Sequence, residues 1–203
     1  MIERYTFWDR MCHWFTSLAY IYCLATGLAF YSPYLFWMAI ALGGGPTSRF
    51  WHPWIGLCFF AAQLWMHKLW DKDVQITAAD REWLDKAKYY VQNEDDKVPP
   101  QGKYNAGQKL YYWAMFYGAF LLLFSGLFMW FPESIPFSWA WIRPVMVLIH
   151  EGAALITIGA FIIHVYMSVF TVPGSVDAMV HGFVSKDWAR THHRLWFHEK
   201  SGE

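Results

Sequence analysis

The sequence predicts an all-α integral membrane protein, a four-helix bundle in up-down order with both termini in the cytoplasm. Composition is the first of three observations behind this prediction. Of 203 residues, 56% are hydrophobic and 21% aromatic, but only 16% are charged, whereas soluble domains approach a quarter. The formal net charge is zero and no segment forms a basic domain, so we expect no nucleic-acid binding. A soluble globular protein is the class that this composition favours least.

The second observation is a set of four apolar stretches, each long enough to cross about 30 Å of hydrocarbon. They are residues 12–31, 52–70, 110–131 and 144–170. A polar loop of residues 71–109 and a tail of residues 171–203 complete a single membrane domain. The first stretch lacks a small-residue cleavage site, so we interpret it as a permanent helix and not as a signal peptide.

The third observation is the distribution of basic residues. Of the 16 Lys and Arg residues, Arg49 and Arg143 lie in the two segments that this order places outside. The others precede the first span, lie at the inner end of the second span (Lys68) or belong to the long loop and the tail. Cytoplasmic segments are enriched in Lys and Arg. Both termini and the loop are therefore predicted to be cytoplasmic, and the protein is expected in the cytoplasmic (inner) membrane of a bacterium.

The connections between the spans contain chain breakers and one helix start. Residues 43–48 (Gly-Gly-Gly-Pro-Thr-Ser) predict a flexible turn, and Pro132 and Pro136 interrupt the chain after the third span. Within the long loop, the residues from Thr77 onward have the pattern of a capped helix start, with Thr77 or Asp80 as the N-cap.

Of the histidines that lie in or at the ends of the spans, four form two pairs at two depths. His150 and His164 share the fourth span and nearly the same helix face, about 21 Å apart along its axis. His52 opens the second span and matches His150 in depth, while His13 opens the first span and matches His164. Histidine is rare in hydrocarbon and marks a functional candidate there. Two stacked pairs are what bis-imidazole ligation of two b-type haems requires.

Alternatives to this ligand set stay open. His67 lies at the inner end of the second span and is the main competitor of His13. A single histidine in a span is often only an inter-helical hydrogen-bonding group. Zinc suits the pattern poorly, because it takes three or four ligands around one point. The histidines of the tail are expected to be solvated or at an interface, and these are His181, His192, His193 and His198.

Cysteines and glycines refine the haem interpretation. The three cysteines belong to no CxxCH motif, which excludes covalently attached c-type haem. Gly56 lies one turn after His52, and Gly27 shares a helix face with His13 at the outer depth. These glycines either leave clearance for a porphyrin edge or serve as helix-packing residues.

The junction of residues 103–109 (Lys-Tyr-Asn-Ala-Gly-Gln-Lys) opens the third span on the cytoplasmic side. Asn105 can donate and accept hydrogen bonds, Gly107 lets the backbone approach a ligand, and the free N–H groups of a helix start add donors. The junction therefore either holds a quinone carbonyl near the inner haem or is an Asn N-cap followed by ordinary interfacial residues.

These motifs resemble those of the cytochrome b (gamma) subunit of the membrane-bound formate dehydrogenases. The matching stretches are residues 10–14 (RMCHW), 52–56 (HPWIG), 103–109 (KYNAGQK), 148–150 (LIH), 163–168 (IHVYMS) and 188–193 (WARTHH). The resemblance covers nearly the whole chain, and its specific part is KYNAGQK together with the four histidines. Glu151 departs from it, because the family tends to place a small residue there.

The resemblance implies cofactors, partners and a direction of electron flow. In that family the subunit carries two haems b, accepts electrons from an iron–sulfur subunit at the outer face, and delivers them to menaquinone or ubiquinone at the inner face. Carried over by position, His52 and His150 would ligate the outer haem, and His13 and His164 the inner one. Asn105 and Gly107 would line the quinone pocket. Formate oxidation belongs to a separate molybdenum or tungsten subunit, so no catalytic residue for it is expected here.

Two other functions are compatible with the residues. The nearer one is a dihaem b subunit of another respiratory complex, such as a hydrogenase or a thiosulfate reductase. The more distant one is a haem-free transporter or membrane anchor. A transporter would show further polar residues or broken helices in the middle of its spans, and the spans offer few of these.

Overall fold

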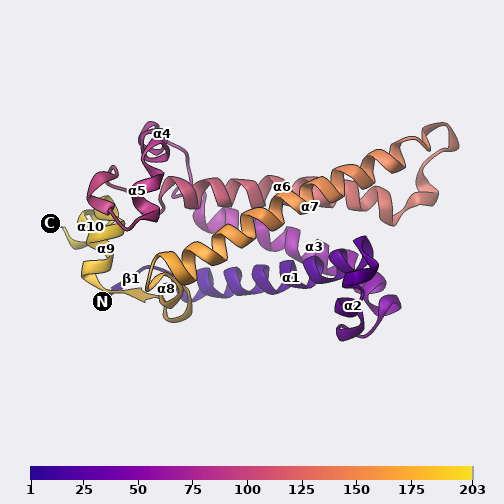
Figure 1. The fold of residues 1–203 in the computed structure, drawn as a ribbon, viewed down its shortest axis with the longest axis horizontal. Coiled ribbons are helices and arrows are strands. Elements are labelled where there is room, and N and C mark those ends of the chain that lie inside the picture. Colours follow the sequence, from indigo (N-terminus) through magenta and orange to yellow (C-terminus); the bar gives the residue numbers. More distant parts are fainter. Residues whose placement is uncertain (203) are drawn as a thin grey trace. The chain divides into compact units, whose positions relative to one another are not determined.

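A computed structural model describes residues 1–202 of the chain. Within these residues, four helices of 25 or 26 residues carry most of the apolar sequence (Figure 1). They are α1 (Phe7–Tyr31), α3 (Gly45–Trp70), α6 (Ala106–Trp130) and α7 (Ile142–Tyr166). Each begins before the apolar stretch that predicts it, because the first turn of a helix also takes polar and interfacial residues.

Short elements connect the long helices and build the tail. The connections contain η1 (Pro33–Leu35), α2 (Trp37–Ala41), α4 (Ala78–Asp85), α5 (Ala87–Val91), η2 (Asp95–Lys97), η3 (Pro132–Ser134) and η4 (Phe137–Trp139). The tail contains the π-helical turn η5 (Met167–Thr171), α8 (Ser175–His181), α9 (Lys186–His192) and α10 (Arg194–Ser201). The N-cap of α4 is Thr77, which was one of the two predicted candidates. The other candidate, Asp80, completes the capping box.

One small ribbon adds to the expected all-α fold. Strand β1 (Ile2–Glu3) pairs antiparallel with β2 (Phe183–Val184), with Ile2 opposite Val184. The N–H groups of Arg4 and Tyr5 donate to the carbonyl of Gly182 (2.8 and 3.2 Å). Gly182 has φ +89°, and a Cβ atom there would come within 2.8 Å of the Tyr5 carbonyl oxygen. Glycine at this position thus lets the N-terminus pair with the tail.

The chain forms two compact units. The first comprises Met1–Met11, His67–Ala114 and the residues from Ala160 onward, and the second comprises Cys12–Met66 and Met115–Gly159.

In the second unit, α1 and α3 pack antiparallel. The Cys12 thiol contacts the carbonyl of Ala62, and the Cys23 thiol contacts the carbonyl of His52, both at 3.7 Å. The early part of α1 therefore lies beside the late part of α3. Between these contacts, the rings of Tyr20 and Phe59 pack with centroids 5.5 Å apart.

The same unit pairs α3 with α6 in opposite directions. The rings of Phe60 and Phe120 meet edge to face at 4.9 Å, and those of Trp54 and Trp130 do so at 5.0 Å. Such aromatic pairs contribute roughly 0.5–1.5 kcal/mol beyond the area that they bury.

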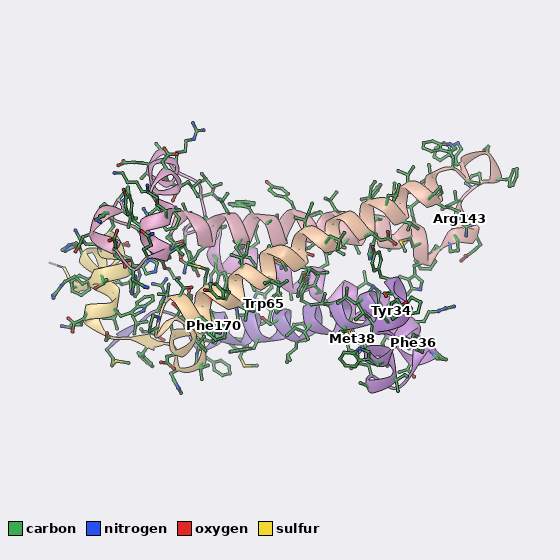
Figure 2. The ribbon with its side chains drawn as sticks, in the orientation of Figure 1. Tyr34, Phe36, Met38, Trp65, Arg143 and Phe170 are labelled. Atoms are coloured by element: carbon green, nitrogen blue, oxygen red, sulfur yellow. The ribbon has the colours of Figure 1, made fainter. Side chains whose placement is uncertain are left out.

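Three helices of the described chain are long and apolar enough to cross a membrane. They are α1, α6 and the continuous segment Ile142–Thr171, which extends α7 through η5. Helix α3 is equally long, but its polar residues, among them the buried Gln63, lower its mean hydropathy. Large apolar side chains remain exposed, including Phe170 at 71% and Tyr34 at 92% (Figure 2). Surfaces of this kind are typical of lipid or protein contact.

The first unit has a core of its own under the start of α6. Trp83 of α4, Tyr90 of α5, Ala106 of α6 and Val172 form a buried cluster. An ion pair ties α4 to α6, because Lys109 Nζ donates to both carboxylate oxygens of Asp80 (3.1 and 2.9 Å). The side chains of Lys109 and Asp80 are both at most 10% exposed.

Candidate functional site

Two of the predicted ligand histidines lie together in the second unit. His52 of α3 and His150 of α7 have ring centroids 6.3 Å apart, with ring planes at 57°. Two metal–nitrogen bonds of about 2 Å, plus roughly 1.2 Å from each nitrogen to its ring centre, give a spacing of roughly 6.4 Å. The observed spacing therefore fits one metal ion held between the two imidazoles.

Hydroxyl groups determine which ring nitrogen of each histidine carries the proton. Thr26 Oγ1 donates to the carbonyl of Tyr22 (2.8 Å), so at 2.7 Å from His52 Nδ1 it acts as the acceptor. Ser125 Oγ likewise donates to the carbonyl four residues earlier (2.6 Å) and accepts from His150 Nδ1 (3.0 Å). Both histidines thus carry the proton on Nδ1, which leaves the Nε2 lone pair of each for a metal. Second-shell acceptors of this kind are typical of metal-ligating histidines.

Glycines leave room around the pair. A Cβ atom at Gly27 would contact His52 Cε1 at 3.6 Å, and one at Gly126 would contact His150 Cε1 at 3.4 Å. At Gly56 an added Cβ atom meets nothing within 4 Å. Gly27 and Gly126 therefore border the imidazoles, whereas Gly56 faces open space, as clearance for a planar group would require.

Thr26, Ser125 and Gly126 were not among the residues predicted for this site. A signal was present, because Thr26-Gly27 in α1 and Ser125-Gly126 in α6 repeat the same hydroxyl–glycine pair. In both helices the hydroxyl accepts from an imidazole, and the following glycine lies beside that ring.

The other two predicted ligands belong to different units, and each is described in its own. In the first unit, the ring of Tyr111 stacks on that of His164, with centroids 4.2 Å apart and planes at 6°. In the second unit, the ring of His13 meets that of Trp14 edge to face at 5.3 Å. The pairing of His13 with His164 stays a prediction from the sequence.

The competing ligand His67 has a partner within the first unit. Its Nδ1 lies 2.6 Å from the hydroxyl of Tyr112, and its ring meets Trp113 edge to face.

The start of α6 has the geometry of a capping box. Gln108 N–H donates to Asn105 Oδ1 (2.9 Å), and Asn105 N–H donates to Gln108 Oε1 (3.0 Å). Asn105 is 2% exposed. The N-cap role of Asn105, one of the two predicted alternatives, is therefore observed, and it occupies the side-chain oxygen of Asn105.

Gly107 lies against α4. A Cβ atom there would meet the indole of Trp83 at 3.6 Å and Asn105 Oδ1 at 3.4 Å. The absence of a side chain at position 107 lets α6 begin close to this indole.

Two tail histidines are less exposed than expected. His193 is fully buried, and His192 Nδ1 lies 2.9 Å from a carboxylate oxygen of Asp95. The expectation of a solvated or interfacial role is wrong for His193, because the N-terminal residues and the segment before α6 cover it. His181 is exposed.

Among residues 1–202, no group of three or more His, Cys, Asp or Glu side chains is placed to hold a metal ion. A haem iron requires fewer protein ligands, because the porphyrin supplies four nitrogens and the protein supplies the axial ligands. A pair of imidazoles with free Nε2 atoms, bordered by glycines, fits haem b.

The helical fold, the apolar spans and the histidine pair define a membrane cytochrome of the b type. The chain belongs to the prokaryotic cytochrome b561 family, whose model matches residues 4–182. It is 34% identical to the nitrate-inducible formate dehydrogenase cytochrome b556(Fdn) subunit of Escherichia coli, over 98% of this chain and 91% of that protein. It is 35% identical to the formate dehydrogenase cytochrome b556(fdo) subunit of the same organism, over 98% and 92%. A cytochrome b556 subunit from Haemophilus influenzae is 29% identical, over 94% and 80%. The resemblance inferred from the motifs is confirmed.

Proposed function

We propose that this chain is the dihaem cytochrome b subunit of a formate dehydrogenase complex, which transfers electrons from an iron–sulfur subunit to quinone. The His52–His150 pair is the observation that carries the proposal, because both Nε2 atoms are left for a metal. Similarity to three formate dehydrogenase cytochrome subunits supports the choice of complex. Formate oxidation itself would take place on a separate molybdenum or tungsten subunit.

The residues of this chain would hold the haems and set their environment. His52 and His150 are the proposed ligands of one haem, with Thr26 and Ser125 keeping Nδ1 of each ring protonated. His13 and His164 are the proposed ligands of the other. Bound haem supplies one-electron redox chemistry at a potential tuned by its ligands, their hydrogen bonds and burial.

The proposed quinone site lies at the start of α6. Asn105 and Gly107 are its candidate residues, and the first N–H groups of the helix provide further donors. The side-chain oxygen of Asn105 is engaged in the cap, so a quinone carbonyl would take its hydrogen bond from the amide NH2 group. Menaquinone and ubiquinone present the same carbonyl chemistry to this amide.

The proposed topology has four membrane crossings, α1, α3, α6 and α7, with both termini and residues 71–109 in the cytoplasm of a bacterium. The distribution of basic residues supports this orientation, because of the 16 Lys and Arg residues Arg49 and Arg143 are the two that this topology places outside the cytoplasm. Arg143 lies at the same end of the second unit as Tyr34 and Phe36 (Figure 2). The iron–sulfur partner would dock at this outer end.

A reduced-minus-oxidised spectrum of the purified protein, with haem b quantified per chain, tests the proposal. Two haems per chain are expected. One haem would mean that one of the pairs is misassigned, with His13 and His67 the first to be tested. No haem, in protein produced with adequate haem supply, would overturn the electron-transfer function.

A further inference from the structure

Arg4 is a buried cation surrounded by aromatic rings. It is 4% exposed, and its guanidinium carbon lies 4.9 Å from the ring centroid of Trp188 and 5.1 Å from that of Trp196. The rings of Tyr5 and Tyr104 lie at 5.4 and 5.9 Å. Within residues 1–202 no carboxylate forms an ion pair with it. Cation–π attraction is strongest where water is excluded, as it is here.

Arg4 also determines the protonation of His193. An arginine Nη2 can only donate, so His193 Nε2, at 3.0 Å from it, must be an unprotonated acceptor. His193 Nδ1 therefore carries the proton and donates to the carbonyl of Gly102 (2.7 Å). The same Nη2 of Arg4 donates to the carbonyl of Lys103 (2.5 Å).

These hydrogen bonds converge on two consecutive carbonyl groups. Gly102 and Lys103 immediately precede Tyr104 and the N-cap Asn105, so the Arg4–His193 pair holds the backbone from which α6 starts. The Lys103 side chain is held as well, by Asp73 at 3.0 Å. The carbonyls that are held in this way stand two and three positions before Asn105, whose side chain caps α6.

We propose that His193, through its contact with Arg4, is a positioning residue for the quinone-binding start of α6, and that it acts only in its neutral form. This inference rests on the proposed function, since it specifies how the quinone site is held and how it responds to pH. Protonation of His193 would place a second cation against Arg4 and replace the Nε2 acceptor with a donor.

The charged and titratable groups around His193 support the sign of this response. Burial and the Arg4 charge lower the pKa of His193 well below its usual value, and neighbouring His192 lowers it further, while the Gly102 carbonyl acts in the opposite direction. His192 is itself held by Asp95 of η2. On the segment before α6, Lys103 is paired with Asp73, and burial raises the pKa of the Tyr104 hydroxyl well above its usual value. Within this cluster, protonation of His193 therefore adds positive charge beside Arg4.

The purified complex with its partner subunits provides the test, with formate as donor and a short-chain naphthoquinone as acceptor. Replacing His193 by Ala removes both bonds. At pH 8 we expect the KM for the naphthoquinone to rise about tenfold relative to the wild type, with kcat at saturating quinone and haem per chain unchanged. Replacing His193 by Gln keeps a donor for Gly102 and an acceptor for Arg4 but cannot be protonated. This variant should keep the wild-type KM at pH 8.

The pH profile separates positioning from a structural role. As the pH falls through the lowered pKa of His193, which lies well below the ordinary histidine value of about 6.5, the wild-type KM should rise relative to that of His193→Gln. The exposed His181, replaced by Gln, is the matched control and should follow the wild type. Parallel profiles for the wild type and His193→Gln, or an unchanged KM in a haem-replete His193→Ala complex, would overturn the inference. If the Ala variant does not assemble, the Gln profile still decides. Wild-type complex that lacks haem or does not reduce the naphthoquinone would instead contradict the proposed function.

Discussion

Thr26 Oγ1 lies 2.7 Å from His52 Nδ1, and this hydroxyl has already committed its proton to a carbonyl of its own helix. Since it can only accept, it keeps the proton of His52 on Nδ1. Ser125 repeats the relationship at His150 from a different helix. The two hydroxyls orient the rings and leave equivalent nitrogens for a metal, which leads to the first prediction.

Replacing Thr26 by Val removes the acceptor while conserving shape. Loss of a second-shell partner typically lowers metal affinity by 10- to 100-fold. We expect weaker retention of one haem and a shifted midpoint potential for it, measured by redox titration and by haem content after detergent washing. Thr26→Ser keeps the hydroxyl and is the control. Identical potentials in the wild type and Thr26→Val would show that the hydroxyl does not tune this ligand.

The assignment of ligands predicts distinct haem counts. His52→Ala should leave one haem per chain, because the remaining imidazole of its pair cannot provide both axial bonds. His67→Ala should keep two, since His67 is not among the proposed ligands. Pyridine haemochrome quantification gives the counts. His13→Ala should also leave one haem, because His13 is the proposed ligand with which His67 competes. If a haem is instead lost on replacing His67 and both are retained on replacing His13, the ligand role belongs to His67.

His164→Ala should abolish quinone reduction, because His164 is a proposed ligand of the haem nearest the quinone site. The His52–His150 haem should stay bound, since its ligands are untouched. Quinone reduction by the complex and the reduced-minus-oxidised spectrum are the two measurements. Normal quinone reduction in this variant would refute the assigned role of His164.

Gly118 allows close approach of α6 and α7 in the second unit. A Cβ atom at Gly118 would come within 2.5 Å of Thr157 Cγ2, and Thr157 is 1% exposed. Gly118→Ala should therefore lower stability by about 1–3 kcal/mol through overpacking, seen as a lower Tm in detergent. At Gly159 an added Cβ atom meets nothing within 4 Å, so Gly159→Ala should be neutral or slightly stabilising. Equal effects would contradict the packing explanation.

The Asp80–Lys109 pair predicts an acid-sensitive contact between α4 and α6. Burial acts to raise the pKa of Asp80, but hydrogen bonds from Lys109 and Thr77 outweigh it and the pKa lies below its ordinary value. The folded state thus prefers the carboxylate. Its stabilising contribution is present above about pH 4, the ordinary carboxyl value, and is lost as the pH falls through the depressed pKa.

Asp80→Asn should destabilise the protein by about 3 kcal/mol at neutral pH, because it leaves Lys109 buried without its counter-ion. The difference in Tm between the variant and the wild type should shrink toward acid pH. Glu82→Gln alters an exposed i,i+4 pair with Lys86 and should have little effect. A difference that does not depend on pH would argue against the ion pair.

The sequence by itself determined the membrane class and the family, and it predicted the histidines that we propose as haem ligands. These features can be recognised from the sequence because each depends on residues close together in the chain or on a simple sum. The length of an apolar run is set by the thickness of the hydrocarbon, the spacing of histidines by the helix period, and the orientation by a count of basic residues. The place of Thr77 and Asn105 at helix starts was also predictable, since capping involves residues only three positions apart.

Tertiary structure decided which distant groups meet. Thr26 meets His52, Ser125 meets His150, and Arg4 meets His193 across up to 189 positions in the chain. Each contact depends on how helices rotate and pack against one another, and a hydrogen bond fails if that rotation changes by a fraction of a turn. Burial of His193 follows from the same cause. Its neighbours in the sequence include charged and polar residues, but the N-terminus and the segment before α6 fold over it.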